Sequence, residues 1–281
     1  LPITSPQDGS NSIFTNTRTF YGAAQDMLAK MKEIASGDLG GTPEDYDISN
    51  ERVHQIADES VGMTFGQVAA RALELGGKYT GSSDLPEELA EWTQISVSRL
   101  AGTAFMGVFH DPRHEGNPPG FTVSCIEIEL DTETGKYEIL DLINVADSGT
   151  IMHPKGMENQ LVGGAVWGIG LSGYERHLYD PQNGMPASTG YWQSKVPTFL
   201  DTPVKIQTGW VDLPDPENPV GARGVGEPAQ GSVSAALTAA ISDALGGHIF
   251  GASPITADMI INHVAGTSED SKLLAQNNFR G

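Results

Sequence analysis

The sequence predicts an α+β fold, with mixed β-sheets, packed helices and two intertwined lobes. Apolar residues recur every three or four positions in residues 20–35 and 233–244, which is the periodicity of amphipathic helices. Residues 121–130 and 136–145 instead alternate apolar and polar side chains over most of their length, as β-strands do. Helical and strand patterns therefore share one chain, and we expect mixed sheets with helices packed on them.

The length of 281 residues is enough for one large domain or two ordinary ones. We expect a first lobe in residues 1–120, with an N-terminal loop and helices. We expect a second lobe in residues 121–281, with a β-hairpin, a glycine-rich helix and a glycine-rich loop. The chain begins with Leu and has no charged, apolar signal segment, so its start is expected to be a cleavage point or an artificial boundary.

Charge and composition exclude several classes of partner. The net charge is −20, with 36 acidic and 16 basic residues, which argues against nucleic acid. No apolar run approaches the roughly 20 residues of a membrane span. The single cysteine, Cys125, cannot build a disulfide framework or a cysteine-ligated iron–sulfur cluster, and we interpret it as a small buried apolar residue.

The N-terminal third is expected to be helical between loops. Residues 1–19 are rich in Ser, Thr and Asn, which is typical of a loop. This loop is either a frayed terminus or a cradle whose hydroxyls and amides bind a ligand. A helix is predicted over 20–35, followed by a loop over 37–59 with at most one short strand. Thr64 and Gln67 have capping-box spacing and open a helix towards Leu75.

The middle of the chain carries a predicted hairpin and two motifs that we reject. The alternation changes phase after Cys125, which indicates a bulge or a strand covered on both faces. Prolines in residues 110–119 prevent the helix that would align His110 with His114, so we do not read a metal site there. Residues 168–173 match G-x-G-x-x-G by letters but end a helix pattern, so these glycines serve close packing or approach to a bulky ligand.

Residues 221–243 read GARGVGEPAQGSVSAALTAAISD and form the most informative stretch. Four glycines in its first eleven residues permit tight turns and close approach to a ligand. A helix follows, and Gly246 and Gly247 end it. Glu227 therefore lies on a stiff loop just before a buried helix, a setting that suits proton transfer. The alternative is that Glu227 is only a helix cap or a solvated side chain.

GVGEP followed by an Ala-rich helix resembles the active-site loop of the molybdenum hydroxylases, the xanthine oxidase and aldehyde oxidoreductase family. TSPQDGSNS resembles the cofactor-contacting segment of that family, and residues 144–175 resemble its Gln followed by a glycine-rich helix. The resemblance covers nearly the whole chain. It corresponds to the C-terminal half of the molybdenum-binding region, so the complete pocket would be shared with a partner.

The resemblance assigns roles to particular residues. Glu227 would be the general base. The cofactor would be contacted by Asp8, Gly9, Ser10, Ser12, Gln160, Val225 and Gly226. No protein side chain would ligate the metal, because the pterin dithiolene holds it in this family. Two positions depart from the family pattern: His153 replaces the usual Asn, and Arg223 replaces the more usual Lys.

The activity that the resemblance implies is oxidation of an electron-poor carbon of an aldehyde or N-heterocycle, with water as the oxygen source. The implied cofactor is molybdenum–molybdopterin, with the cytosine dinucleotide form preferred. The implied partners are a second molybdenum-binding subunit carrying the N-terminal half, an iron–sulfur subunit with [2Fe–2S] and a flavin subunit with FAD. A cytoplasmic location is expected, with the periplasm as the alternative.

Two other interpretations stay open. The chain could be a non-catalytic structural half-subunit in which Glu227 caps a helix, or a hydrolase or binding protein with an unrelated acidic cleft. A serine nucleophile elbow is not among its motifs. Substrate identity, electron acceptor and oligomeric state are not encoded in any motif of the chain.

Overall fold

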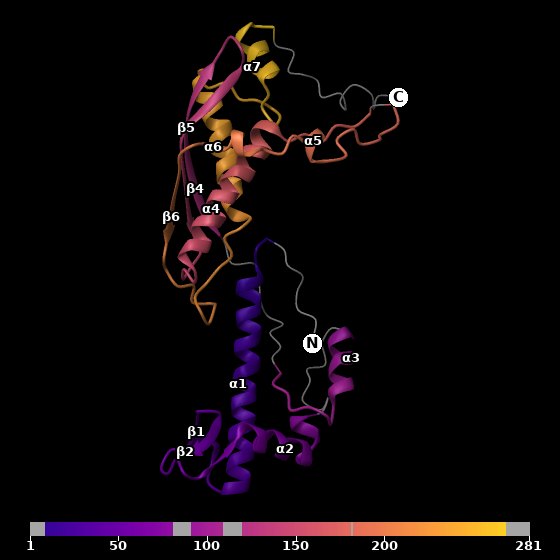
Figure 1. Cartoon of the computed structure of the whole chain (residues 1–281), viewed down its shortest axis with the longest axis vertical. Coiled ribbons are helices and arrows are strands. Elements are labelled where there is room, and N and C mark those ends of the chain that lie inside the picture. Colours follow the sequence, from indigo (N-terminus) through magenta and orange to yellow (C-terminus); the bar gives the residue numbers. More distant parts are fainter. Residues whose placement is uncertain (1–8, 81–90, 109–119, 181, 268–281) are drawn as a thin grey trace. The chain divides into compact units, whose positions relative to one another are not determined.

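The computed structural model describes residues 9–80, 91–108, 120–180 and 182–267 (Figure 1). These residues form an α+β fold, as predicted, and divide into two compact units. The described residues of the first unit lie within Ser12–Asn117. Those of the second unit lie within Pro118–Gly281, together with Gly9, Ser10 and Asn11. A short N-terminal segment thus belongs to the unit formed by the second half of the chain.

Helices and strands occur in both units (Figure 1). The first unit contains α1 (Ser12–Leu39), β1 (Tyr46–Ser49), β2 (Arg52–Gln55), β3 (Gly62–Thr64), α2 (Phe65–Leu75) and α3 (Glu91–Leu100). The second contains β4 (Phe121–Asp131), β5 (Lys136–Asp147), α4 (Pro154–Ile169), α5 (Tyr191–Ser194), β6 (Ile206–Val211), α6 (Pro228–Ala244) and α7 (Ala257–Val264). No helix among these is both long and apolar enough to cross a membrane.

Helix α1 is longer than the sequence predicted, because residues 12–19 are helical and not a loop. Their hydroxyls bond to carbonyl groups within the helix itself: Thr17 donates to Ile13 O, and Thr19 donates to Thr15 O at 2.9 Å. Threonines that back-bond in this way satisfy their polar groups without leaving the helix. A polar stretch that looked like a loop can therefore continue the helix.

The first unit also contains an antiparallel sheet where the sequence predicted a loop. Strands β1 and β2 are joined by a two-residue turn, in which Asn50 and Glu51 both have positive φ, 49° and 58°. Such a turn matches the twist of a hairpin, and Asn at its first position was the overlooked signal. The sheet packs its buried Tyr46 and Val53 against Ile34 of α1. The capping box at the start of α2 is confirmed.

The second unit is built on a mixed three-stranded sheet of order β4-β5-β6. Strands β4 and β5 form the predicted antiparallel hairpin, and Gly135 closes its turn with a φ of +68°. Strand β6 pairs with β5 in parallel. A β-bulge is present, but on β5, where Leu140 is the extra residue opposite Glu127 and Ile128. Side chains of β4 alternate without interruption, so the change of phase after Cys125 does not mark a bulge in β4. Helices α4 and α6 pack together over this sheet (Figure 1).

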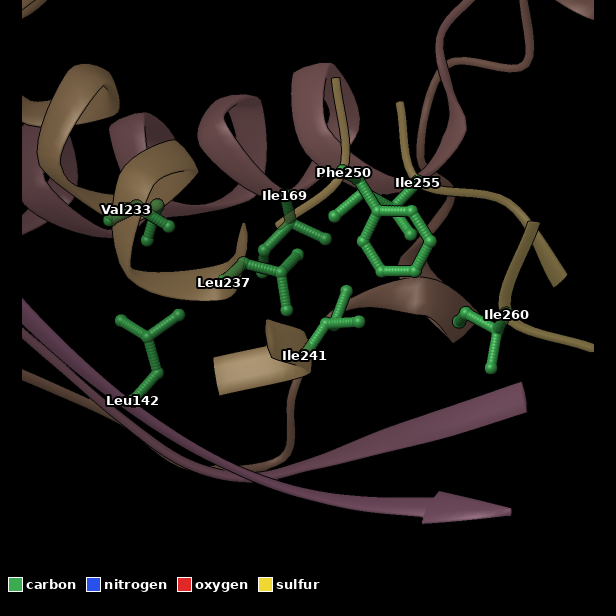
Figure 2. Close-up of a cluster of buried hydrophobic side chains, with 9 residues drawn as sticks. Leu142, Ile169, Val233, Leu237, Ile241, Phe250, Ile255 and Ile260 are labelled. Atoms are coloured by element: carbon green, nitrogen blue, oxygen red, sulfur yellow. The ribbon is translucent and has the colours of Figure 1, made fainter. Parts of the chain in front are cut away.

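The main hydrophobic core of the second unit lies between the sheet and its helices (Figure 2). Leu142 from β5 faces residues of α4 and α6, among them Ile169, Leu237 and Ile241. Each of these side chains is at most 1% exposed. The helical period predicted for residues 233–244 is therefore the buried stripe of α6, which fixes the helix that follows Glu227.

Cys125 is exposed, which corrects the prediction that it is buried. It shares the outer face of β4 with Phe121 and Val123, and both of these are also exposed. The inward positions are taken by Thr122, which donates to Pro228 O at 3.1 Å, and by Ser124, which bonds Ser232 at 2.7 Å. Thr122 and Ser124 share the inner face of β4 with Ile126, Ile128 and Leu130, which pack against the main core, so hydroxyl bonds and apolar packing turn the same face inward.

The last helix begins at Ala257, although Ser253 and Pro254 have the residue types of a helix cap and a first helical position. The preceding segment is tied to the end of α4, because Ser253 donates to Leu171 O at 3.0 Å and Ile255 N donates to Ser172 O at 2.8 Å. Ile255 is buried in the main core. These contacts hold the segment outside a helix, and α7 begins after Thr256.

Candidate active site

Glu227 is the residue immediately before α6, and its side chain is half-buried. Its backbone is already helical, with φ −67° and ψ −38°, and its carboxylate makes no capping bond to α6. Pro228 occupies the first helical position, where the missing N–H is no loss. The carboxylate is therefore held by contacts outside its own helix.

Those contacts come from Ser10, which lies 217 positions away in the chain. The Ser10 hydroxyl accepts a hydrogen bond from the Glu227 backbone N–H at 2.9 Å. The same hydroxyl donates to Oε2 of Glu227 at 3.2 Å. One side chain thus contacts both the main chain and the carboxylate of Glu227.

Gln160 and two glycines complete the surroundings. A Cβ atom added to Gly226 would lie 2.8 Å from both Oε1 of Gln160 and Oγ of Ser10. A Cβ added to Gly224 would lie 2.0 Å from the Ser10 carbonyl oxygen. Neither position has room for a side chain, so the backbone of the Glu227 loop (residues 221–227) lies directly against Ser10 and Gln160.

The structure brings together some of the predicted site residues and separates others. Ser10, Gln160, Gly226 and Glu227 meet, and Gly9 adjoins Ser10 in the second unit. Gly9 has a φ of +55°, but a Cβ there would meet no described protein atom within 4 Å, so its conformation is what requires glycine.

Val225, Ser12 and Asp8 are the remaining predicted site residues. Val225 is partly buried and packs against the cluster that contains Met157 and Leu161. Ser12 begins α1 in the first unit. Asp8 lies outside the described residues.

Sequence reasoning missed an ion-pair cluster that anchors the Glu227 loop. Nη2 of Arg223 lies 2.7 Å from Oδ1 of Asp147, at the end of β5, and Nε lies 3.2 Å from Oδ2 of Asp215. The Arg223 side chain is only 11% exposed. The Arg223 backbone N–H also donates to Ser148 O at 2.7 Å. The only sequence signal was the presence of charged residues beside predicted turns.

A buried Asn also ties the site helices together. Nδ2 of Asn144, on β5, donates to Leu161 O at 2.9 Å and to Ala229 O at 3.1 Å. Leu161 follows Gln160 on α4, and Ala229 lies two residues after Glu227 on α6. A single side chain therefore fixes the spacing between the helix carrying Gln160 and the helix that follows Glu227.

His153, which stands where the family usually has Asn, caps helix α4. Nδ1 of His153 accepts a hydrogen bond from the Gly156 backbone N–H at 2.7 Å, at the start of α4. An Asn side chain caps helices by the same kind of contact. The replacement therefore leaves the start of α4 capped.

A carboxylate on a glycine-rich loop, with a hydroxyl and an amide packed against that loop, suits an organic cofactor held by hydrogen bonds. Among the described residues, no three His, Cys, Asp or Glu side chains cluster in a way that could hold a metal ion. A family model for the molybdopterin cofactor-binding domain matches residues 1–203. The chain belongs to this molybdopterin cofactor-binding family.

Relatives of known function agree with this family. A molybdenum-binding subunit of aldehyde oxidoreductase from Escherichia coli K12 is 25% identical over 263 residues, which is 93% of this chain and 31% of that protein. The gamma subunit of the 6-hydroxypseudooxynicotine dehydrogenase complex from Paenarthrobacter nicotinovorans is 31% identical over 150 residues, 53% of this chain and 19% of that protein. The chain thus spans less than a third of the length of either relative.

A solved structure gives the same result. Quinoline 2-oxidoreductase from Pseudomonas putida 86 superposes with a TM-score of 0.63 at 25% identity, over 92% of this chain and 30% of that chain. The predicted membership in the xanthine oxidase and aldehyde oxidoreductase family is confirmed, because the relatives are molybdenum oxidoreductases.

The residues around the Glu227 loop fit a molybdopterin cofactor. Gly224 and Gly226 present bare backbone, which can approach a bulky ligand closely. Ser10 and Gln160 supply a hydroxyl and an amide for hydrogen bonds to a pterin edge. A cofactor that brings its own metal ligands needs only such groups from the protein.

Proposed function

We propose that this chain is the molybdenum-cofactor-binding part of a multi-subunit hydroxylase or dehydrogenase, with Glu227 as its general base. When bound, the molybdopterin cofactor supplies oxidative hydroxylation of an electron-poor carbon, with oxygen from water. The observation that carries the proposal is the Glu227 carboxylate. It is half-buried, does not cap α6 and is held by Ser10 beside Gln160. A carboxylate that served only as a helix cap would bond to its own helix.

The residues of the chain would divide the work as follows. Gln160, Ser10 and the backbone at Gly226 would hold the cofactor, with Gly9, Val225, Ser12 and Asp8 as further proposed contacts. Oε2 of Glu227 is bonded to Ser10, so we assign proton transfer to Oε1. A general base contributes roughly 10²- to 10⁴-fold to a rate when it lies within hydrogen-bond reach of the proton.

The cofactor form and the partners are further parts of the proposal. We assign the cytosine dinucleotide form of the pterin, a second molybdenum-binding subunit with the N-terminal half, an iron–sulfur subunit and a flavin subunit, in the cytoplasm. The names of two relatives support a multi-subunit assembly, because one is the gamma subunit of a dehydrogenase complex and another is a molybdenum-binding subunit. An aldehyde or an N-heterocycle is the proposed substrate class.

The experiment compares Glu227→Gln with Glu133→Gln in the assembly purified with its partners. Glu133 lies in the exposed turn between β4 and β5, so the control makes the same chemical change far from the site. We expect Glu227→Gln to lower kcat by about 10²- to 10⁴-fold while molybdenum content stays unchanged. Turnover of aldehydes and N-heterocycles is measured as the rate at which an artificial electron acceptor is reduced.

Two results would overturn the proposal. If Glu227→Gln turns over at the wild-type rate, Glu227 has only a structural role, and the chain is better described as a non-catalytic half-subunit. A well-folded native assembly without molybdenum, measured by elemental analysis, would remove the cofactor from the proposal altogether.

A further inference from the structure

Ser10 has an unusual backbone conformation. Its φ is +61°, in the left-handed region that residues other than Gly, Asn and Asp seldom adopt. Only four residues other than Gly have a positive φ in the described part of the chain. Such strained positions persist where surrounding contacts hold them, and they concentrate at functional sites. Ser10 occupies such a position.

The Ser10 hydroxyl makes two hydrogen bonds to one residue, Glu227. The hydroxyl accepts from Glu227 N at 2.9 Å and donates to Oε2 of the same residue at 3.2 Å. These two bonds fix the main chain and the side chain of Glu227 relative to each other. A carboxylate held only by its own rotamer preferences would be free to turn, because its terminal torsion has a broad energy well.

The loop is shaped to receive this contact. Any side chain at Gly224 would collide with the Ser10 carbonyl, 2.0 Å from the position of its Cβ. Any side chain at Gly226 would lie 2.8 Å from the Ser10 hydroxyl. Two glycines of the Glu227 loop therefore make room for Ser10, and the left-handed turn at Gly9 and Ser10 delivers the hydroxyl to that space.

We infer that Ser10 is a positioning residue for the Glu227 carboxylate, and not chiefly a cofactor contact. The inference rests on the proposed function of Glu227 and deepens it. By holding Oε2, Ser10 orients Oε1 for proton transfer, and it does so from a segment more than two hundred residues away in the sequence. Misplacement of a reacting group by about 1 Å can cost roughly 100-fold in rate.

The test is Ser10→Gly in the complete assembly. Glycine removes the hydroxyl and also relieves the positive φ, so a purely structural role for Ser10 predicts an equal or higher melting temperature with unchanged turnover. The positioning role predicts the same melting temperature but a kcat lowered at least about 10-fold, with KM and molybdenum content unchanged. Hydrogen–deuterium exchange at the Glu227 amide should also become faster, because its acceptor is lost.

Two further variants complete the test. Gly226→Ala pushes a methyl group towards the Ser10 hydroxyl and should lower kcat in the same way. Asn50→Gly relieves another positive φ, in the β1–β2 turn of the first unit, and should leave kcat unchanged.

Each outcome decides one proposal. If Ser10→Gly turns over normally while Glu227→Gln is inactive, the positioning role is wrong and the proposed function stands. If Glu227→Gln is fully active, the proposed function itself fails. If Ser10→Gly loses molybdenum along with activity, holding the cofactor is the main role of Ser10 and the positioning role is overturned.

Discussion

Tyr137 on β5 carries a buried hydroxyl that makes no hydrogen bond within the described part of the chain. Burial raises the pKa of this phenol above its ordinary value, and the nearby Tyr174 raises it further. A raised pKa means that the folded state favours the neutral phenol. Its contribution to stability is present below the unfolded pKa of about 10 and is lost as the pH rises towards the folded pKa.

Replacement of this hydroxyl should stabilise the protein. We expect Tyr137→Phe to raise the free energy of unfolding at pH 7 by about 1 kcal/mol, because an unbonded polar group leaves the interior. The fall in melting temperature above pH 10 should become shallower. The matched control is Tyr46→Phe. The buried Tyr46 hydroxyl donates to Gly40 O at 2.7 Å, so its removal should lower the free energy of unfolding by about 1 kcal/mol. Thermal melts at pH 7 and pH 10.5 measure both, and a less stable Tyr137→Phe would contradict the assignment.

Helices α4 and α6 cross closely because α4 carries glycines at the contact. A Cβ at Gly168 would lie 2.6 Å from Gln230 O and 2.8 Å from Cβ of Val233. A Cβ at Gly164 would lie 2.7 Å from Cβ of Ala229. The prediction that these glycines allow close packing is thereby confirmed. This crossing also sets how far Gln160 lies from the start of α6.

Two glycines of α4 should respond to alanine with opposite signs. Gly168→Ala forces the helices apart, so we expect a loss of about 1–3 kcal/mol of stability. Gly163→Ala adds a methyl where no atom lies within 4 Å, and should gain about 0.5–1 kcal/mol from helix propensity. Melting temperatures of both variants check the prediction. Equal effects at the two positions would show that the contact between α4 and α6 is not tight.

Local patterns predicted the elements whose signal is local. The period of α6, the β4–β5 hairpin and the capping box of α2 were all readable, because each depends on neighbours a few residues apart. The start of β4 was misread, because Thr122 and Ser124 face inward and bond to α6, whereas Val123 and Cys125 are exposed.

In the candidate site, too, only the features with a local sequence signal were predicted. Glu227 and Gln160 were identifiable from motifs, but the bond between Ser10 and Glu227 joins positions 217 residues apart, and no spacing rule reports it. The Arg223 cluster likewise joins Asp147 and Asp215 only in three dimensions. The proposed site residues were therefore readable from motifs, whereas the contacts that hold them depend on the fold.

At the scale of the whole molecule, the second unit exposes a run of large apolar side chains. We call it the apolar segment, and its members are each at least 84% exposed: Tyr191, Trp192, Phe199, Leu200 and Val204. Large exposed apolar side chains gathered in a short stretch of sequence suggest an interaction site, and aromatic residues dominate binding energy at such sites. The chain spans only 31% of the aldehyde oxidoreductase subunit, so relatives contain much additional protein that could cover such a segment.

If the second molybdenum-binding subunit proposed above exists, we expect the apolar segment to bind it. A double variant, Trp192→Ser with Phe199→Ser, should weaken co-purification of that partner at least about 10-fold, because truncating such anchors costs about 2 kcal/mol or more each. The control is Ile56→Ser, which removes an exposed apolar side chain from the first unit. Partner stoichiometry after affinity purification, with melting temperature as the check on folding, measures the effect. An intact assembly in the double variant would mean that the segment faces solvent and that the partner binds elsewhere on the chain.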